Sequence, residues 1–284
     1  MSAADDAVAR LIGHGVTRTR PLGAITRATL DDGREVVAKT GEPTAVAAEA
    51  AGLRWLAVPG GPGVPEVLGA DDAWLVSEAV AEGSATPEAA AAFGRALATL
   101  HAAGAPAFGA PPPGGPVDAW IGDAPMRNDP APAGTRWIDW YVEARVLPYV
   151  RLAVDRGGMS SVHAAQVEKG CARLTGGGAD VGPDEPPARL HGDLWTGNVL
   201  WARDHAWVID PAAHGGHRET DLAMLALFGC PRLETVLAAY DEAAPLAAGW
   251  RDRVGLHQLF PLLVHAALFG GGYAGSACER ISAL

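Results

Sequence analysis

Three polar residues in the second half of the chain have the types and spacing that phosphoryl transfer requires. Asp193 and Asn198 lie five positions apart within residues 191–198, and Asp210 ends the apolar run 206–209. Phosphoryl transfer uses one carboxylate to orient and deprotonate the attacking hydroxyl, and oxygen ligands for the Mg²⁺ on the nucleotide phosphates. The catalytic loop of protein kinases, H-R-D-L-x-x-x-N, has the same five-residue spacing. An Asp at the end of a buried strand can face that metal.

Each residue also has an ordinary structural interpretation. A lone Asp-x-x-x-x-Asn pair usually marks a turn, and a lone Asp after a strand is usually a loop residue or a helix cap. Three such residues, correctly spaced across a loop and a strand, favour the catalytic interpretation. Gly192 stands where protein kinases have Arg, which favours a small-molecule kinase over a protein kinase.

Composition limits the other function classes. The net charge of −11 argues against a nucleic-acid or anionic-membrane surface, so we expect neither partner. Three widely spaced cysteines predict neither a disulfide framework nor a metal site, and we expect reduced thiols in a cytoplasmic protein. The N-terminal residues lack the apolar segment of a signal peptide, and no stretch approaches the ~20 apolar residues of a membrane span.

The first part of the chain is predicted to be a β-rich lobe. Alternating apolar residues and a tight-turn signal at 31–34 indicate a hairpin whose third strand ends at Lys39. The expected elements are a helix at 5–13, strands at 16–22, 25–30 and 35–39, a helix at 44–57, and strands at 64–69 and 74–78.

The rest of the chain is predicted to be mostly helical. Helices are expected at 87–103, 135–156, 160–174, 219–229, 232–243 and 250–269. The Pro/Gly-rich segments 104–116 and 175–187 cannot hold regular structure, and we interpret 104–116 as a flexible loop rather than a lid. The order predicts an α+β, bilobal, protein-kinase-like fold with a nucleotide-binding lobe at 1–80, a helical lobe at 81–284 and nucleotide in the cleft.

The chain resembles the fructosamine kinase (ketosamine-3-kinase) family, in the aminoglycoside-phosphotransferase-like branch of the kinase-like fold. Residues 191–198 meet the family pattern H-G-D-L-W-[ST]-G-N in full, and residues 210–224 meet D-P-A-x-x-x-G-H-R-E-x-D-L-A-M. The match continues in residues 140–148 and 263–273, so it covers nearly the whole chain. His214 stands where the family usually has Tyr.

The resemblance implies roles for individual residues. Asp193 would be the base toward a sugar hydroxyl, and Asn198 and Asp210 would hold Mg²⁺. Lys39 would contact the nucleotide α- and β-phosphates, because a lysine that closes an apolar strand can project a point charge into a cleft. Its carboxylate partner would be Glu49.

Other residues of the predicted nucleotide site are less specific. Glu42 competes with Glu49 as the partner of Lys39. Glu78 to Val80 lie where the connector between the lobes would bind adenine through main-chain groups. The turn at 21–26 holds a single glycine where kinases have a Gly-rich phosphate loop. We therefore expect binding of the nucleotide phosphates to depend more on Lys39 and Mg²⁺.

Further polar and aromatic residues near the motif have two interpretations each. Trp195 could stack on the acceptor or be a core residue that wedges the loop. His217 and Glu219 could face the sugar or cap the following helix. His191 is expected to hydrogen-bond the backbone near the strand 206–209 that precedes Asp210. Asp221 is expected to hydrogen-bond the loop 191–198.

The resemblance implies an ATP- and Mg²⁺-dependent kinase that phosphorylates a sugar hydroxyl of a ketosamine, either a fructosamine or a ribulosamine. The acceptor would be a free adduct or one on a protein lysine, and the role would be deglycation. One alternative is an aminoglycoside- or choline-type acceptor, against which Trp195 and residues 217–219 argue. Another is a non-catalytic nucleotide-binding regulator, which the single glycine of the phosphate turn favours and the intact Lys39 and Asp193 oppose.

Overall fold

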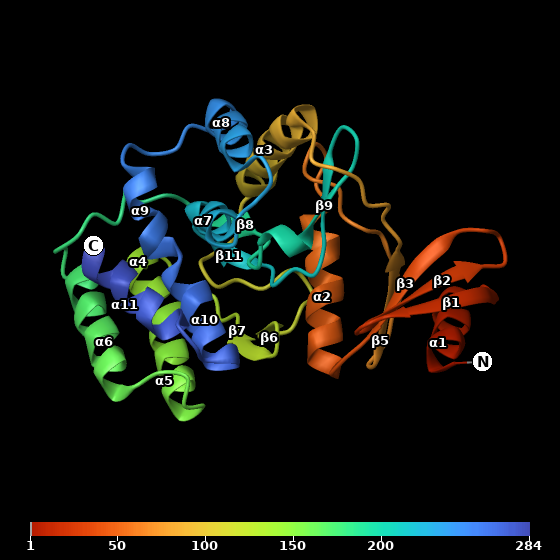
Figure 1. The fold of residues 1–284 in the computed structure, drawn as a ribbon, viewed down its shortest axis with the longest axis horizontal. Coiled ribbons are helices and arrows are strands. Elements are labelled where there is room, and N and C mark those ends of the chain that lie inside the picture. Colours follow the sequence, from red (N-terminus) through yellow and green to blue (C-terminus); the bar gives the residue numbers. More distant parts are fainter. Residues whose placement is uncertain (1) are drawn as a thin grey trace.

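The computed structural model describes residues 2–284 and has two parts, a small β-rich part and a larger helical part (Figure 1). The N-terminal part comprises α1 (Ala3–Ile12), β1 (Val16–Leu22), β2 (Ile25–Leu30), β3 (Glu35–Thr40), α2 (Pro43–Leu56), β4 (Val67–Ala70) and β5 (Trp74–Glu78). Its strands form one antiparallel sheet in the order β1-β2-β3-β5-β4. The predicted fold class is confirmed.

The sheet directs Lys39 toward the cleft because side chains alternate between its two faces. Val36 and Ala38 of β3 are buried in a cluster with Val8 of α1. Lys39 follows Ala38 and pairs with Leu75 of β5, so its side chain projects from the opposite face, where Leu75 packs against α2. The apolar alternation of β3 thus fixes the direction of its one charged inner residue.

The helical part carries several short hairpins among its helices. Its elements are α3 (Pro87–Ala102), β6 (Asp118–Ile121), β7 (Ala124–Arg127), α4 (Trp137–Tyr141), the π-helical turn η1 (Val142–Val146), α5 (Leu147–Asp155), α6 (Ser161–Thr175), β8 (Ala188–Leu190), the 3₁₀ turn η2 (Thr196–Asn198), β9 (Val199–Trp201), β10 (Ala206–Val208), β11 (His214–Gly216), α7 (Glu219–Leu227), α8 (Leu233–Ala243), α9 (Trp250–His257), α10 (Leu259–Phe269) and α11 (Tyr273–Ala283). Among residues 2–284, no helix is long and apolar enough to cross a membrane.

Several elements differ from the sequence predictions. The helix expected at 135–156 contains the π-helical turn, and the helix expected at 250–269 is interrupted at Gln258. The β6–β7 hairpin was not predicted, because each strand has only four residues and β7 contains Pro125. The predicted lobe boundary near residue 80 lies in the segment between β5 and α3 and remains a prediction.

The Pro/Gly-rich segment 104–116 is a packed connection, so its interpretation as a flexible loop is wrong. Phe108 and Ala110 are buried, and main-chain hydrogen bonds join Gly109 and Ala110 to Gly215 at 2.8 and 2.9 Å. The segment forms no helix or strand, as predicted, but it buries apolar side chains and pairs with the edge of β11. It is therefore packed against β11.

Candidate active site

The catalytic loop, residues 191–198, is held by a buried carboxylate on the next helix. Asp221 of α7 accepts hydrogen bonds from the main-chain N–H groups of His191 and Gly192 at 2.8 and 3.0 Å. Its Oδ2 also lies 3.2 Å from Nε2 of His101. Burial alone would raise the pKa of Asp221, but His101 and the other partners hold it below the ordinary value. The predicted role of Asp221 is confirmed.

Gly192 is required by the shape of this loop. Its φ is +82°, and a Cβ atom there would lie 2.1 Å from the carbonyl oxygen of Ala212. A side chain would therefore clash with backbone in addition to straining the left-handed conformation.

His191 links the catalytic loop to the end of β10. Its Nε2 lies 2.9 Å from the carbonyl oxygen of Ile209, and its Nδ1 accepts from the N–H of Asp193 at 3.3 Å. Burial lowers the pKa of His191, which favours the neutral ring that this pattern requires. The predicted structural role is confirmed: His191 fixes Asp193 relative to the residue before Asp210.

The predicted base, Asp193, and its amide neighbour, Asn198, are in contact. Nδ2 of Asn198 donates to Oδ2 of Asp193 at 3.1 Å and to the Asp193 carbonyl at 2.9 Å. Burial raises the pKa of Asp193 to about 6, with smaller contributions from Asp210 and Asp221, while the hydrogen bond from Asn198 opposes the shift. A carboxylate with this pKa is ionised near neutral pH and still basic enough to accept a hydroxyl proton.

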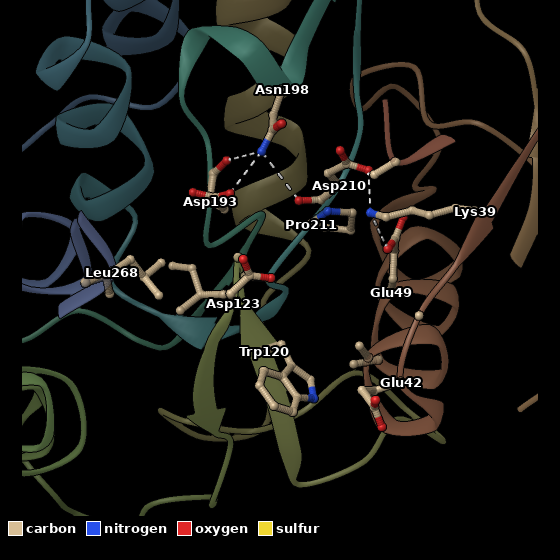
Figure 2. Close-up of a pocket in the computed structure, with 18 of the residues that line it drawn as sticks. Lys39, Glu42, Glu49, Trp120, Asp123, Asp193, Asn198, Asp210, Pro211 and Leu268 are labelled. Atoms are coloured by element: carbon tan, nitrogen blue, oxygen red, sulfur yellow. Dashed lines mark hydrogen bonds and ion pairs between the residues drawn. The ribbon is translucent and has the colours of Figure 1, made fainter. Parts of the chain in front are cut away.

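Lys39 joins the two parts of the molecule across the cleft (Figure 2). Its Nζ lies 2.7 Å from Glu49 on α2 and 3.1 Å from Oδ1 of Asp210. Burial opposes the ammonium charge, but Glu49 and Asp210 outweigh it and raise the pKa of Lys39. Glu42 also lines the cleft but makes no ion pair with Lys39.

Asp210 has the ligand chemistry and the exposure that a magnesium ion requires. Its side chain is half exposed, and the residue adopts φ +51°, a strained conformation that is typical of functional positions. Because Asn198 donates through Nδ2, its Oδ1 is available as a second oxygen ligand. Mg²⁺ in nucleotide sites is bound by one or two protein oxygens together with phosphates and water. Asn198 and Asp210 fit that description.

These residues line a cleft of about 590 Å³ between the sheet and the helical part. Lys39, Glu49, Asp193, Asn198 and Asp210 all contribute to its wall. The cleft therefore brings together the predicted base, the predicted metal ligands and the predicted phosphate-contacting lysine.

The predicted connector residues Glu78 and Val80 do not line this cleft. The N–H of Glu78 donates to the carbonyl of Glu66 at 2.9 Å. The carbonyl of Val80 accepts from Nη2 of Arg27 at 2.7 Å. The N–H of Glu78 and the carbonyl of Val80 therefore both have hydrogen-bond partners within the protein.

Trp195 lines the cleft and is 39% exposed, so the alternative of a core tryptophan is wrong. Its indole ring covers Gly197, where a Cβ atom would lie 2.3 Å from the ring. The glycine of the L-W-[ST]-G-N pattern thus makes room for the ring, and the exposed face of the ring is free to stack on a ligand.

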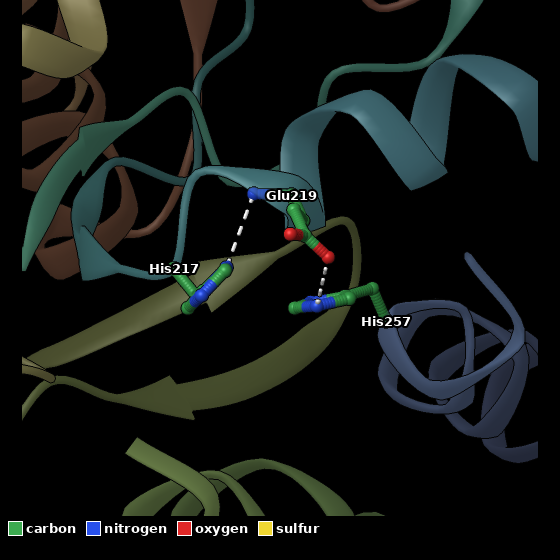
Figure 3. A group of neighbouring side chains, drawn as sticks. All are labelled: His217, Glu219 and His257. Atoms are coloured by element: carbon green, nitrogen blue, oxygen red, sulfur yellow. Dashed lines mark hydrogen bonds and ion pairs between the residues drawn. The ribbon is translucent and has the colours of Figure 1, made fainter. Parts of the chain in front are cut away.

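His217 and Glu219 do not line the cleft, which does not support the expectation that they face the sugar. Figure 3 shows both side chains beside His257. Both are buried where α7 begins beside α9. Glu219 forms a two-point ion pair with Arg253 at 2.7 and 3.1 Å, and its Oε2 lies 3.3 Å from His257. Although burial opposes it, His257 and Arg253 lower the pKa of Glu219 to about 2. The start of α7 turns inward, and its charges are paired there.

This buried group is not arranged as a metal site. Nδ1 of His217 accepts the N–H of Glu219 at 3.3 Å, so the neutral ring carries its proton on Nε2. A protonated Nε2 cannot ligate a cation, and Arg253 already neutralises the carboxylate. The hydrogen bond to the N–H of Glu219 agrees with the capping alternative for His217.

Two elements that the sequence interpretation did not connect with the site also contribute to the cleft. Trp120 and Asp123 lie on the β6–β7 hairpin, and His265, Leu268 and Phe269 lie at the end of α10. The Gly-Asp pair at 122–123 is a hairpin-turn signal, but the four-residue strands on either side lack a clear apolar–polar alternation.

The chain matches the model of the fructosamine kinase family over residues 26–284. A protein-ribulosamine 3-kinase of Arabidopsis thaliana chloroplasts is 35% identical over 199 residues, which are 67% of this chain and 56% of that protein. The chain thus spans little more than half of that relative. A probable ketoamine kinase of Thermus thermophilus is 33% identical over 255 residues, covering 88% of this chain and 87% of that protein.

Solved structures agree with these matches. A crystal structure assigned as a fructosamine-3-kinase of Thermobifida fusca has a TM-score of 0.90 and 46% identity, and covers 99% of this chain and 98% of that one. A mutant aminoglycoside phosphotransferase in complex with ADP and hygromycin B has a TM-score of 0.66, 18% identity and 99% coverage of both chains, which supports the shared fold alone. The active-site geometry and the match over residues 26–284 lead to one conclusion: the chain belongs to the fructosamine kinase family.

Proposed function

We propose that this chain is an ATP-dependent kinase that phosphorylates a hydroxyl of a ketosamine, a sugar joined through its first carbon to an amine. The observation that carries the proposal is the cleft in which Asp193, Asn198, Asp210 and the Lys39–Glu49 pair converge. The names of relatives supply the acceptor class, since they include ketoamine and ribulosamine kinases.

In the proposed reaction the sugar hydroxyl oxygen attacks the γ-phosphorus of ATP while its proton passes to Asp193. The bond from the γ-phosphorus to the β–γ bridging oxygen breaks, and ADP leaves with that oxygen. Asn198 holds the carboxylate of Asp193 in place through its 3.1 Å hydrogen bond. Positioning and charge stabilisation, rather than covalent chemistry, carry this kind of transfer.

Lys39 is the proposed contact to the nucleotide phosphates, and Glu49 keeps its ammonium group oriented. Asn198 and Asp210 would hold Mg²⁺, which when bound neutralises phosphate charge. We also propose that the connector at Glu78 to Val80 receives the adenine. The carbonyl of Val80 already accepts one hydrogen bond from Arg27 and has a second lone pair for such a contact. A related fold binds ADP in a solved complex, which supports a nucleotide in this cleft.

The proposed biological consequence is deglycation, since a phosphorylated ketosamine eliminates its sugar more easily. The acceptor would be a free adduct or one on a protein lysine. Fructosamines and ribulosamines are both within the proposed class.

Consumption of ATP with Mg²⁺ should be measured against a fructosamine, a ribulosamine, an aminoglycoside and choline, with Asp193→Ala as the control. We expect turnover on a ketosamine and none in the variant, which should still bind nucleotide. Turnover of the aminoglycoside or of choline alone would overturn the proposal that the acceptor is a ketosamine. Nucleotide binding without turnover of any acceptor would favour a regulator.

A further inference from the structure

Asp123 is a cleft carboxylate to which the proposed reaction assigns no role. It lies in the turn between β6 and β7, is exposed, and lines the cleft. Its carboxylate forms no ion pair and no hydrogen bond with any of residues 2–284. Figure 2 shows it on the side of the cleft where Asp193 and Leu268 lie, away from Lys39 and Glu49.

The hairpin that carries Asp123 is fixed at both ends. Near the tip, Nε1 of Trp120 donates to Oγ1 of Thr44 on α2 at 2.9 Å. At the base, the buried Arg145 of η1 donates to Oδ1 of Asn128 at 2.7 Å and to a main-chain carbonyl of β7 at 2.9 Å. A side chain on such a supported turn is preorganised for binding.

In the part of the chain that the structure describes, the cleft offers Asp123 no positively charged side chain as a partner. Carboxylates in the lining outnumber the single lysine, and Lys39 is already paired with Glu49 and Asp210. With Asp193 on the acceptor hydroxyl and Asp210 on the phosphate side, Asp123 is left to interact with a positive charge on the acceptor. A charge-assisted hydrogen bond from a protonated amine fits that position.

Four aromatic rings contact one another in a row, and three of them, Trp195, His265 and Phe269, line the cleft. We call Trp195, Phe228, His265 and Phe269 the aromatic ledge. Consecutive ring centroids are 6.2, 4.7 and 5.5 Å apart. Trp195 is 39% exposed and Phe269 is 68% exposed, so the ledge is open to solvent at both ends. Such a surface covers carbon chains and the apolar faces of sugars.

The geometry points to Asp123 as the residue that selects acceptors by the positive charge on their linking amine, with the aromatic ledge against the carbon substituent of that amine. This inference rests on the proposed function for the sugar hydroxyl and extends it to the amine. It places an alkylamine such as a lysine side chain at the open mouth, beside Phe269. An uncharged isostere of the acceptor should lose this contact.

The test compares two acceptors that differ in one atom. N-butyl fructosamine carries a secondary amine, and its 1-O-butyl ether has oxygen at that position and no charge. Calorimetric binding of both, in the presence of Mg²⁺ and ADP, and turnover of both with ATP should be measured for the wild type, Asp123→Asn and Asp123→Glu. Asp118→Asn is the matched control, because Asp118 lies on the same hairpin, pairs with Arg127 and does not line the cleft.

We expect Asp123→Asn to weaken binding and raise the KM of the amine about tenfold, with the ether changed less than about twofold. The wild-type preference for the amine should shrink in high salt, and Asp123→Glu should recover part of it. Equal affinity for amine and ether in the wild type, or an equal loss of both in Asp123→Asn, would overturn the inference even if turnover is normal. Charge-selective binding without turnover would support the inference and overturn the proposed function instead.

Discussion

At the scale of single residues, the environment of Asp193 links catalysis to stability. Burial raises the pKa of this carboxylate to about 6, while its hydrogen bond to Asn198 favours the ionised form and opposes the shift. A more exposed Asp would be a weaker base, and a fully buried one would stay protonated near neutral pH. The position of Asp193 lies between these extremes.

The first prediction concerns the pH dependence of the reaction. A base must be ionised to accept a proton, so kcat/KM should fall as the pH drops through about 6, approaching a tenfold loss per pH unit below it. The measurement is kcat/KM between pH 4.5 and 8.5 under conditions in which ATP saturates. A profile that stays flat down to pH 4.5 would contradict the role of Asp193.

The second prediction is that Asp193→Asn stabilises the fold. The raised pKa means that the folded state favours the protonated carboxyl, so its stability is intact below pH 3.8 and is lost as the pH rises through about 6. The shift spans about two pKa units, or roughly 3 kcal/mol at the upper limit. Urea unfolding should show Asp193→Asn to be more stable by about 1–3 kcal/mol at pH 7.5 and unchanged at pH 3.5. An Asp193→Asn variant that folds but is less stable than the wild type at pH 7.5 would contradict the raised pKa of Asp193.

The sequence predicts that Asp193, Asn198 and Asp210 lie together, because their spacing is fixed within a short loop and strand, and all three line the cleft. His217 lies near the same motif, but its direction depends on how α7 meets α9, which no local pattern encodes. Asp123 was missed because it reaches the cleft only through tertiary packing of the hairpin.

At the scale of elements, α7 holds the catalytic loop. Asp221, near its start, accepts two main-chain hydrogen bonds from the loop and lies beside His101 of α3. One buried carboxylate therefore joins the loop to two helices. Removing its charge leaves those donors with weaker partners in a site that water cannot reach.

The third prediction is that Asp221→Asn lowers both activity and stability. We expect about 2–4 kcal/mol less free energy of unfolding and at least about a hundredfold loss in kcat. Because the folded pKa of Asp221 is depressed, its contribution is present above the unfolded pKa and is lost as the pH falls through the lower folded value. The stability difference should therefore narrow in acid. Asp252→Asn, an exposed change on α9, is the control, and equal effects of both would contradict the account.

The sequence predicts helices and strands correctly where the hydrophobic periodicity is strong and the helix or strand is long. The strands at 16–22 and 25–30 have the bounds that their alternation predicts, and the helix at 87–103 ends one residue earlier than expected. The segment 104–116 and the β6–β7 hairpin were misjudged for the same reason: both are short, contain proline and are stabilised by tertiary packing rather than local propensity.

At the scale of the whole molecule, the two parts are joined across the cleft by contacts of different kinds. Lys39 of β3 reaches Asp210 of the helical part, and Trp120 of the hairpin reaches Thr44 of α2. The Lys39 ion pair lies in the proposed nucleotide site. Nucleotide binding and the packing of the sheet on the helices should therefore be coupled.

The fourth prediction is that Lys39→Met separates nucleotide binding from folding. The change removes the proposed phosphate contact, so we expect the KM for ATP to rise about tenfold or more and kcat to fall at least about a hundredfold. The rise in Tm that Mg²⁺ and ADP give the wild type should shrink in the variant. The matched control is Lys169→Met, an exposed lysine on α6. A full nucleotide-dependent rise in Tm and normal kcat in Lys39→Met would place the nucleotide elsewhere.

The most direct measurement follows the phosphoryl group itself. The wild type should be incubated with Mg²⁺, ATP and N-butyl fructosamine, and the product analysed by mass spectrometry and ³¹P NMR, with Asp193→Ala alongside. The account predicts a phosphate monoester on one sugar hydroxyl, formed in step with ADP and absent from the variant. Inorganic phosphate as the sole product, or the same monoester from Asp193→Ala at the wild-type rate, would contradict it.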